Sequence, residues 1–402
     1  MAFARTGPLR HELESLFPHR PFSLRFWDDS VVRATEPGAP TFTFHSPLAR
    51  AHVLRAPGEL GLGRAYVTGL LDVDDLDAAL LVVDAFEPPS LSPAQGARLA
   101  VAVMRASGLV VPPRPPNTEL RLRGERHTLI RDRRAVQHHY DVGNEFFQLF
   151  LDRSMTYSCA YFSGGADPLE EAQEAKLELV CRKLGLRDGE RVLDVGCGWA
   201  SLAIHAASRH GARVLGVTLA EQQAQLARER VRAAGLTDRI EIRLADYREV
   251  MDGPFDAISS IGMVEHVGRE KIDVYAAQLG ALLRPGGRLL NHGIARLGPG
   301  KEERGGAFSE RFVFPDGAPV HVSHVMAALE TAGFVPGHVE GFAEDYSRTL
   351  REWARRLDEH GNEAERIAGP ERLRVWRLYL RAARHGFDTG FTSVYQVLAR
   401  LS

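Results

Sequence analysis

The sequence predicts an α/β fold, and two observations support this prediction. First, Arg191–Ala206 places an apolar run, two glycines and an Ala/Leu/Ile-rich stretch in the order of a buried strand, a tight turn and a helix. The glycines let the backbone approach a ligand at the N-terminus of the new helix. Second, four later runs are predicted as strands: Arg213–Val217, Ile240–Leu244, Phe255–Ile261 and Arg288–Asn291. In an open α/β sheet, ligands bind at the carboxyl ends of the strands.

Length and composition exclude several classes of protein. The 402 residues fit two domains, and 44% hydrophobic residues suffice for a sizeable core. A net charge of −2 gives no global basic field, so we expect no nucleic-acid partner. The cysteines Cys159, Cys181 and Cys197 lack C-x-x-C spacing, which predicts a reducing compartment, no disulfide framework and no zinc site. No stretch reaches eighteen uninterrupted apolar residues, so we expect a cytoplasmic protein without a transmembrane segment.

Residues 1–107 are predicted to form a smaller N-terminal α+β domain. Short β-like runs occur at Phe22–Phe26 and Thr41–Phe44, and the acids from Asp72 to Asp77 precede a helix that begins near Leu76. No residues here have catalytic spacing. We therefore expect a helper domain that makes substrate or dimer contacts.

Residues 108–135 are predicted to be a linker with a basic segment. Gly108–Asn117 contains four prolines, which cannot continue a helix and stiffen the chain. The arginine-rich run Arg121–Arg134 follows. It is either a solvated face or a local patch for phosphate headgroups, and its composition alone leaves both interpretations open.

Val136–Phe162 is the most distinctive stretch ahead of the glycine turn. The sequence predicts a turn at Tyr140–Asn144, an aromatic helix over Glu145–Leu151 and a Tyr/Ser/Cys-rich loop over Met155–Phe162. Core packing alone does not explain why His138, Tyr140, Tyr157 and Cys159 gather here.

Polar residues follow the predicted strands at their carboxyl ends. Asp246 follows the third strand and either caps the next turn or contacts a ligand. Glu265 and His266 follow the fourth strand, and His292 follows the fifth. From the residues alone, Glu265 or His292 is the candidate general base.

The remaining elements are predicted from apolar runs and helix signals. A loop is expected over Gly298–Gly306. The last strands are expected at Phe312–Pro315 and Gly333–Phe342, a helix from Tyr346 to about Leu357, and a basic helical tail over Glu371–His385.

Six ordered motifs from His138 onward resemble the cyclopropane-fatty-acyl-phospholipid synthases and mycolic acid cyclopropane synthases. They are H-H-Y-D-V-G-N-E-F-F, M-T-Y-S-C-A-Y-F, D-V-G-C-G-W, G-V-T-L-A-E-Q-Q, G-M-V-E-H-V-G and D-Y-S-R-T-L-R-E-W. Ser201 replaces the third glycine of the dinucleotide fingerprint, and D-V-G-C-G-W is similar to the first motif of class I S-adenosylmethionine (SAM) methyltransferases. The resemblance implies a Rossmann-like catalytic domain over 136–402 with a mainly parallel seven-stranded sheet.

The resemblance also implies two groups of site residues and no metal. SAM contacts are expected at Tyr157, Ser158, Asp194, Gly196, Cys197, Gly198, Thr218, Leu219, Gln223, Asp246, Tyr247 and Arg248. A bicarbonate ion, which serves the family as catalytic base, is expected at Glu265, His292, Tyr346 and the backbone of Cys159 and Ile294. The chain departs from the family at Ala383, where relatives often carry a cysteine, and this departure argues against a covalent cysteine mechanism.

The implied reaction adds a methylene from SAM across the cis double bond of an unsaturated phospholipid acyl chain, giving a cyclopropane. The implied enzyme is peripherally associated with the membrane, where its substrate lies, and it can form a homodimer. Three alternatives stay open: a same-family enzyme that makes a methylene- or methyl-branched chain, a small-molecule O- or N-methyltransferase, and an inactive lipid-binding or scaffold protein.

Overall fold

The computed structural model describes residues 6–108, 113–165, 167–298 and 306–402, and it divides into two compact units. Unit 1 comprises Met1–Glu119 with Gly369–His385, and unit 2 comprises Leu120–Ala368 with Gly386–Ser402. The loop expected at Gly298–Gly306 lies almost wholly outside the described residues, as does part of Gly108–Asn117.

Unit 1 contains a small four-stranded sheet in the order β2-β1-β3-β4, flanked by short helices. The helix expected near Leu76 begins there, because the Asp75 side chain accepts hydrogen bonds from the amides of Asp77 and Ala78. The unit contains α1 (Gly7–Leu16), β1 (Ser23–Arg25), β2 (Val31–Val32), β3 (Thr41–Phe44), α2 (Leu48–Arg55), α3 (Glu59–Val67), β4 (Leu71–Val73), α4 (Leu76–Ala85) and α5 (Pro93–Ser107).

The C-terminal helix α16 (Gly361–Asp388) is broken at Gly369, whose φ of 80° is not helical, and Pro370 follows. The part after the break belongs to unit 1. Arg374 donates to the Leu71 carbonyl at 2.8 Å and to Asp72 at 2.9 Å, and its guanidinium lies 4.1 Å from the Tyr66 ring centre. The two units therefore do not coincide with the predicted ranges 1–107 and 136–402, because the part of α16 after Gly369 contacts residues of unit 1 that are distant in the sequence.

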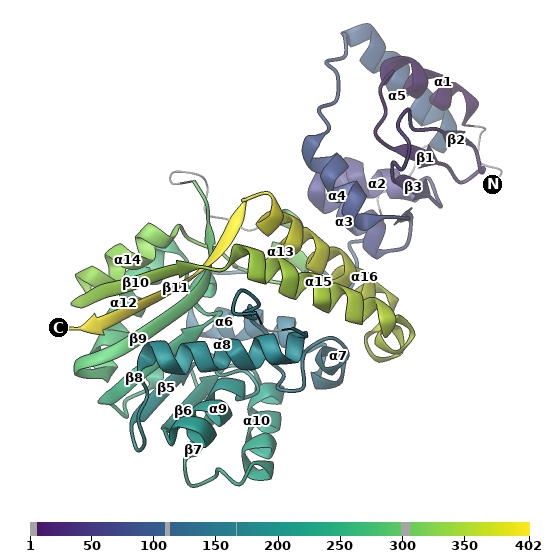
Figure 1. Cartoon of the computed structure of the whole chain (residues 1–402). Coiled ribbons are helices and arrows are strands. Elements are labelled where there is room, and N and C mark those ends of the chain that lie inside the picture. Colours follow the sequence, from purple (N-terminus) through teal and green to yellow (C-terminus); the bar gives the residue numbers. More distant parts are fainter. Residues whose placement is uncertain (1–5, 109–112, 166, 299–305) are drawn as a thin grey trace. The chain divides into compact units, whose positions relative to one another are not determined.

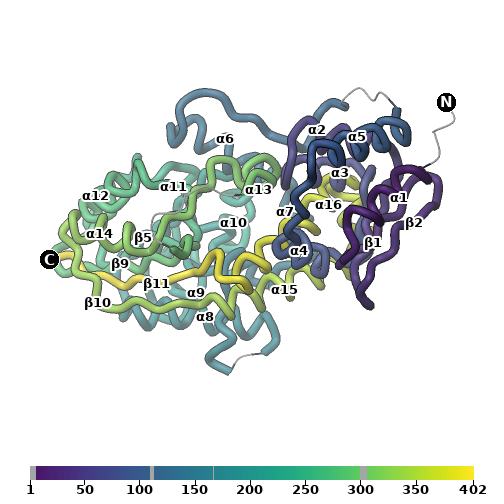
Figure 2. The backbone as a smooth tube through the Cα atoms, turned by 90° about the horizontal axis from the view of Figure 1, so that it is seen from above, coloured from purple at the N-terminus to yellow at the C-terminus, as the bar shows by residue number. Residues whose placement is uncertain are grey.

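Unit 2 is built on a seven-stranded sheet in the order β10-β11-β9-β8-β5-β6-β7. The strands β5 to β9 pair in parallel, while β11 runs antiparallel to both β9 and β10. Both views show β11 lying beside β10, with the C-terminus at its end (Figures 1 and 2). The strands are β5 (Arg191–Val195), β6 (Arg213–Thr218), β7 (Ile240–Leu244), β8 (Phe255–Ile261), β9 (Leu283–Arg296), β10 (Phe334–Gly341) and β11 (Thr392–Leu401).

Helices cover both faces of this sheet, because successive strand residues point to opposite faces. Val192 belongs to a buried cluster with residues of α8, α9 and α10, whereas Leu193 belongs to a buried cluster with residues of α12 and α14. These helices are labelled in Figure 1. The helices of unit 2 are α6 (Leu129–Tyr140), α7 (Asn144–Gln148), α8 (Leu169–Leu184), α9 (Ser201–His210), α10 (Glu221–Ala233), α11 (Val264–Val267), α12 (Ile272–Leu282), α13 (Ala307–Phe312), α14 (Val322–Thr331) and α15 (Ala343–Glu359).

The prediction of a strand at Phe312–Pro315 is wrong. Phe312 ends α13, and Phe314 stacks on His139 with ring centres 4.1 Å apart. A short apolar run cannot be assigned to helix, strand or packed loop by its pattern alone. The seventh strand is β11, a segment to which the sequence assigned no element.

Candidate active site

One pocket opens at the carboxyl edge of β5, β6 and β8, and we call it the strand-edge pocket. Its volume is about 1210 Å³ with the open mouth included, which accommodates a nucleoside-sized ligand. All twelve residues expected to contact a cofactor line it: Tyr157, Ser158, Asp194, Gly196, Cys197, Gly198, Thr218, Leu219, Gln223, Asp246, Tyr247 and Arg248.

The glycine turn brings the backbone to the pocket wall. Gly196 has φ 76°, and a Cβ built there would lie 2.7 Å from Cγ of Met263. The amides of Gly196 and Cys197 both donate to the Val217 carbonyl at 3.0 Å, which fixes the turn against β6. Only glycine fits this position without displacing the Met263 side chain.

A buried acid and a buried amine lie at the base of the pocket. Ser259 Oγ donates to Asp194 at 2.7 Å, and Lys176 Nζ donates to Ser158 Oγ at 2.6 Å. Burial raises the pKa of Asp194 to about 6, although Ser259 and the Lys176 charge lower it. Burial lowers the pKa of Lys176 to about 8. The sequence predicted Asp194 but not Lys176, which lies in a helix without a motif.

The ends of β6 and β7 supply the other polar side of the pocket. Thr218 Oγ1 donates to Gln223 Oε1 at 2.9 Å. Asp246 accepts from the Arg248 amide at 2.9 Å, and Arg248 Nη2 contacts both Asp246 and Asp132 at 2.7 Å. Asp246 therefore caps the following turn and also lines the pocket, so both roles weighed for it are compatible.

Glu265 and His292 lie outside this pocket and are strongly desolvated. Within the described residues, Glu265 Oε2 and His292 Nε2 are buried and have no hydrogen-bond partner. Burial raises the pKa of Glu265 to about 7, although its own amide and that of Ile294 lower it. Burial lowers the pKa of His292 to about 3. At neutral pH His292 is therefore uncharged, and the Glu265 carboxyl group is close to the midpoint of its titration.

Phe342 connects the other residues expected beside them. Its ring stacks on His292 with centres 6.2 Å apart, and its carbonyl lies 3.7 Å from Cys159 Sγ. The same carbonyl accepts from the Tyr346 amide at 3.0 Å in the first turn of α15. Burial raises the pKa of the Cys159 thiol well above its usual value, so this side chain is not a thiolate.

Aromatic rings of Val136–Phe162 pack together beside the strand-edge pocket, and we call this cluster the aromatic wall. Tyr157 lines the strand-edge pocket and stacks on Trp353, with ring centres 5.1 Å apart. The ring centre of Phe147 lies 5.2 Å from that of Trp199 and 5.4 Å from that of Tyr157. Such a wall excludes water and offers π faces to a cation.

Comparison with known proteins decides the family. The family described as "Mycolic acid cyclopropane synthetase" matches residues 127–397. The chain belongs to this family. It is 39% identical over 370 residues to a Mycobacterium tuberculosis protein named "Probable fatty acid methyltransferase", covering 88% of this chain and 85% of the relative.

Two further relatives agree with this assignment. The cyclopropane-fatty-acyl-phospholipid synthase of Escherichia coli K12 is 34% identical over 346 residues, covering 85% of this chain and 83% of that protein. The crystal structure of mycolic acid cyclopropane synthase CmaA1 with SAH and CTAB has a TM-score of 0.63 and 33% identity, and it covers 67% of this chain and 98% of that chain. The chain is a SAM-dependent methyltransferase of the cyclopropane synthase family, with the α/β fold predicted from its sequence.

The strand-edge pocket fits SAM on its own geometry. The cradle at Gly196 admits no side chain, and the acids Asp194 and Asp246 lie at the carboxyl ends of β5 and β7, the two strands that flank β6. Tyr140 and His266 also line the pocket, although the sequence assigned neither to the cofactor. Burial raises the pKa of Tyr140 to about 12, so its hydroxyl stays protonated at neutral pH.

The arginine-rich run divides into paired and exposed residues. Arg126 pairs with Glu310, and Arg131 Nη2 donates to Asp316 at 2.7 Å. By contrast Arg133 and Arg134 are exposed on α6, together with Leu129 and Ile130, which are 42% and 70% exposed. Within the described ranges, every helix is too short or too polar to cross a bilayer.

Proposed function

We propose that this enzyme transfers a methylene from SAM to the cis double bond of an unsaturated phospholipid acyl chain and forms a cyclopropane ring. The observation that carries the proposal is that Glu265 Oε2 and His292 Nε2 are each buried without a hydrogen-bond partner among the described residues. Buried polar atoms are normally hydrogen-bonded, so each of these two atoms can take a polar ligand. When bound, SAM supplies an electrophilic methyl group to the alkene, and bicarbonate accepts the proton whose loss closes the ring.

Each residue expected at the bicarbonate fits a hydrogen-bonding task. Glu265, with a pKa of about 7, is in part protonated at neutral pH and can donate to an anion. His292 stays neutral, and its Nδ1 lies 3.1 Å from Gln396 Nε2. Gln396 as donor would leave the only ring proton on Nε2, so that Nε2 could donate to the anion as well. The amides of Cys159 and Ile294 and the hydroxyl of Tyr346 would complete the set.

The aromatic wall has a separate task in this proposal. Methyl addition to an alkene leaves a carbocation on the acyl chain, which water would trap. Tyr157 and Trp353 would face that charge with π surfaces, and burial of Phe147 and Phe150 keeps water out. The neutral thiol of Cys159 is a poor nucleophile toward the cation.

A same-family enzyme that makes a methylene- or methyl-branched chain is the second candidate. It is favoured by the relative named "Probable fatty acid methyltransferase", which matches 88% of this chain. For a methylene branch, a hydride shift along the chain would first move the cation to the methylated carbon, and loss of a proton from the methyl group would then give C=CH2. A saturated methyl branch would need a later reduction by a second enzyme. Residue types alone do not separate the two outcomes, because both need the same methyl donor and a base.

Fatty acids from a bacterium that expresses the chain test this proposal. A cyclopropane and a methylene branch each add one CH2, so mass alone does not distinguish them. We expect the upfield ring protons of a cyclopropane in the NMR spectrum of the purified product. A product with terminal-methylene protons would establish the second candidate, and unmodified lipids in the presence of active SAM binding would contradict both.

We also propose that α6 docks on an anionic membrane surface. Ile130, Arg133 and Arg134 share one helical face by their spacing, and all three are exposed. An exposed apolar side chain beside basic residues is typical of a helix that lies in a membrane interface. Unit 1 is proposed to assist through substrate or dimer contacts.

A further inference from the structure

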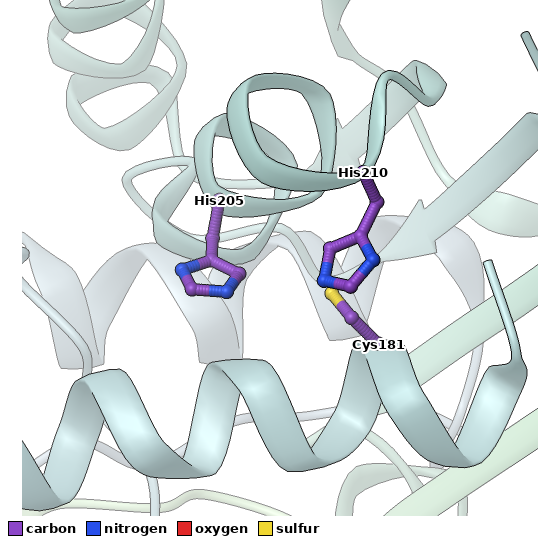
Figure 3. Close-up of side chains that lie close together, drawn as sticks. All are labelled: Cys181, His205 and His210. Carbon is purple, nitrogen blue, oxygen red and sulfur yellow. The ribbon is translucent and has the colours of Figure 1, made fainter. Parts of the chain in front are cut away.

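A second group of reactive side chains lies between α8 and α9. Cys181 comes from α8, and His205 and His210 come from α9. Figure 3 shows the three side chains directed into the space between the two helices. Their potential ligand atoms all lie within 4.8 Å of one another. None of the three lines the strand-edge pocket, so the proposed methyl transfer gives this group no role.

Glu178 adds a fourth potential ligand. Its Oε2 lies 3.0 Å from Nε2 of His205 and 3.0 Å from Nε2 of His210. Glu178 and Cys181 are three residues apart on α8, which places both side chains on the face toward α9. The donor set is therefore two imidazole nitrogens, one sulfur and one carboxylate oxygen.

Burial and charge also suit a metal ion. Cys181 is fully buried, the side chains of His205 and His210 are 9% and 18% exposed, and that of Glu178 is 38% exposed. The partly open Glu178 side gives an ion a way in from solvent. A thiolate and a carboxylate would neutralise a divalent cation, so the loaded group would bury no net charge. The Cys181 thiol would release its proton to solvent on binding.

We propose that Glu178, Cys181, His205 and His210 form a structural zinc site. Zinc takes nitrogen, sulfur and carboxylate ligands in a tetrahedron with bonds of about 2.0–2.3 Å, which sets the ligand atoms roughly 3–4 Å apart. The ligand atoms of Cys181, His205 and His210 now lie within 4.8 Å of one another, so the proposal requires these side chains to move closer together when the ion binds. Four protein ligands leave no open position, so the ion would join helices and take no part in chemistry.

The location gives the site a structural purpose. α8 carries Lys176 and Leu177 of the strand-edge pocket, and α9 begins directly after the glycine turn with the lining residues Ser201 and Leu202. An ion held by both helices would fix these two walls of the pocket relative to each other. The sequence does not reveal the site, because its ligands come in two pairs on either side of β5 and without C-x-x-C spacing.

Metal titration of the full chain tests this proposal. The purified protein is stripped with a chelator and titrated with Zn²⁺, and the bound metal is measured by mass spectrometry after gel filtration. We expect one zinc per chain and a higher unfolding temperature, because an ion that binds the folded state stabilises it. Co²⁺ in the same protein should show a thiolate-to-metal charge-transfer band, which requires Cys181 or another cysteine as ligand.

Variants assign the site to these residues. The double change His205→Gln with His210→Gln should weaken zinc binding by at least about tenfold. Loss of a residue that only hydrogen-bonds to a metal ligand already costs about that much affinity, and loss of two ligands should cost more. Cys181→Ala should abolish the charge-transfer band. Glu174→Gln removes an exposed acid of α8 that contacts Arg209 of α9 at 3.2 Å, and as the matched control it should bind zinc as the wild type does.

Three results would overturn the assignment. They are no zinc retained by the wild-type chain, equal zinc affinity in the double histidine variant, and cobalt bound without a thiolate band. If the buried Cys181→Ala variant does not fold, His210→Gln alone serves as the test, because the His210 side chain is partly exposed and its loss should weaken zinc binding without unfolding the chain.

Discussion

The acids of the strand-edge pocket and the buried groups of Glu265 and His292 differ in their hydrogen-bond partners. In the pocket, Asp246 is paired with Arg248, and Asp194 accepts from Ser259. Glu265 Oε2 and His292 Nε2, by contrast, are buried without partners among the described residues. Burial raises the pKa of Glu265 and lowers the pKa of His292, so it favours the neutral form of both side chains. Paired charges suit a region that binds a charged cofactor. A dry, neutral region suits an unstable cation and the removal of its proton.

The first prediction tests whether the two regions are functionally separate. Glu265→Gln should lower kcat by about 10²- to 10⁴-fold, the usual contribution of a group in proton transfer. The dissociation constant of SAM should stay unchanged, because Glu265 does not line the strand-edge pocket. Steady-state product analysis and calorimetric titration measure the two effects.

The matched control is Glu270→Gln, which removes an exposed carboxylate a few residues along the chain and should leave both values unchanged. If Glu265→Gln instead weakened SAM binding as strongly as it lowered kcat, the two regions would not be separate.

The second prediction changes the pocket and leaves the buried group intact. Gly196→Ala should weaken SAM binding by at least about tenfold, because a left-handed backbone costs a non-glycine residue roughly 1–2 kcal/mol and its Cβ would also clash with Met263. Gly198→Ala has a similar strain at φ 53°, but its Cβ would meet no atom within 4 Å. Calorimetric titration should show a clearly smaller loss for Gly198→Ala, and equal losses would contradict the role of the Met263 contact.

The third prediction concerns the neutral state of His292. Its folded pKa of about 3 lies below the ordinary value of 6.5, so the unfolded chain binds more protons between these values. The stability contribution is present above pH 6.5 and is lost as the pH falls toward 3. Between pH 6.5 and 5 the wild type should therefore lose about 2 kcal/mol relative to His292→Asn.

Urea unfolding of both proteins at the two pH values measures this difference. Glu265, whose pKa is raised, has the opposite sign: its contribution is present below the ordinary value of 4.5 and is lost as the pH rises through 7. It is common to both proteins and cancels in the comparison. A constant gap between wild type and His292→Asn would show that His292 is solvated.

The fourth prediction concerns the proposed docking of α6 on the membrane that supplies the lipid. Arg133→Glu with Arg134→Glu should weaken binding to anionic vesicles, since each basic residue near such a surface contributes about 1 kcal/mol. Arg351→Glu removes an exposed arginine of α15 and is the charge-matched control for one such change. Vesicle co-sedimentation measures the difference, which added salt should reduce. Equal loss in the Arg351 variant would contradict docking through α6.

Local pattern predicted the parts of the fold that local interactions fix. The strands β7 and β8 match the predicted ranges Ile240–Leu244 and Phe255–Ile261 at both ends, and β5 lies at the start of the strand–turn–helix predicted over Arg191–Ala206. The helix α4 begins at its acidic cap, as predicted. The segment Phe312–Pro315 was assigned wrongly, since whether an apolar run pairs in a sheet or packs on a ring such as His139 depends on distant residues.

The sequence by itself indicated the family, the α/β fold and, through the family resemblance, twelve of the residues that line the strand-edge pocket, because motifs at glycine turns and strand ends are local features with fixed spacing. Only the tertiary structure revealed the desolvation of Glu265 and His292, the place of Lys176 in the pocket, the return of Gly369–His385 to unit 1, and the grouping of Cys181 with His205 and His210. The reason is physical: burial and proximity arise from packing between segments that are distant in the chain, and no local pattern records them.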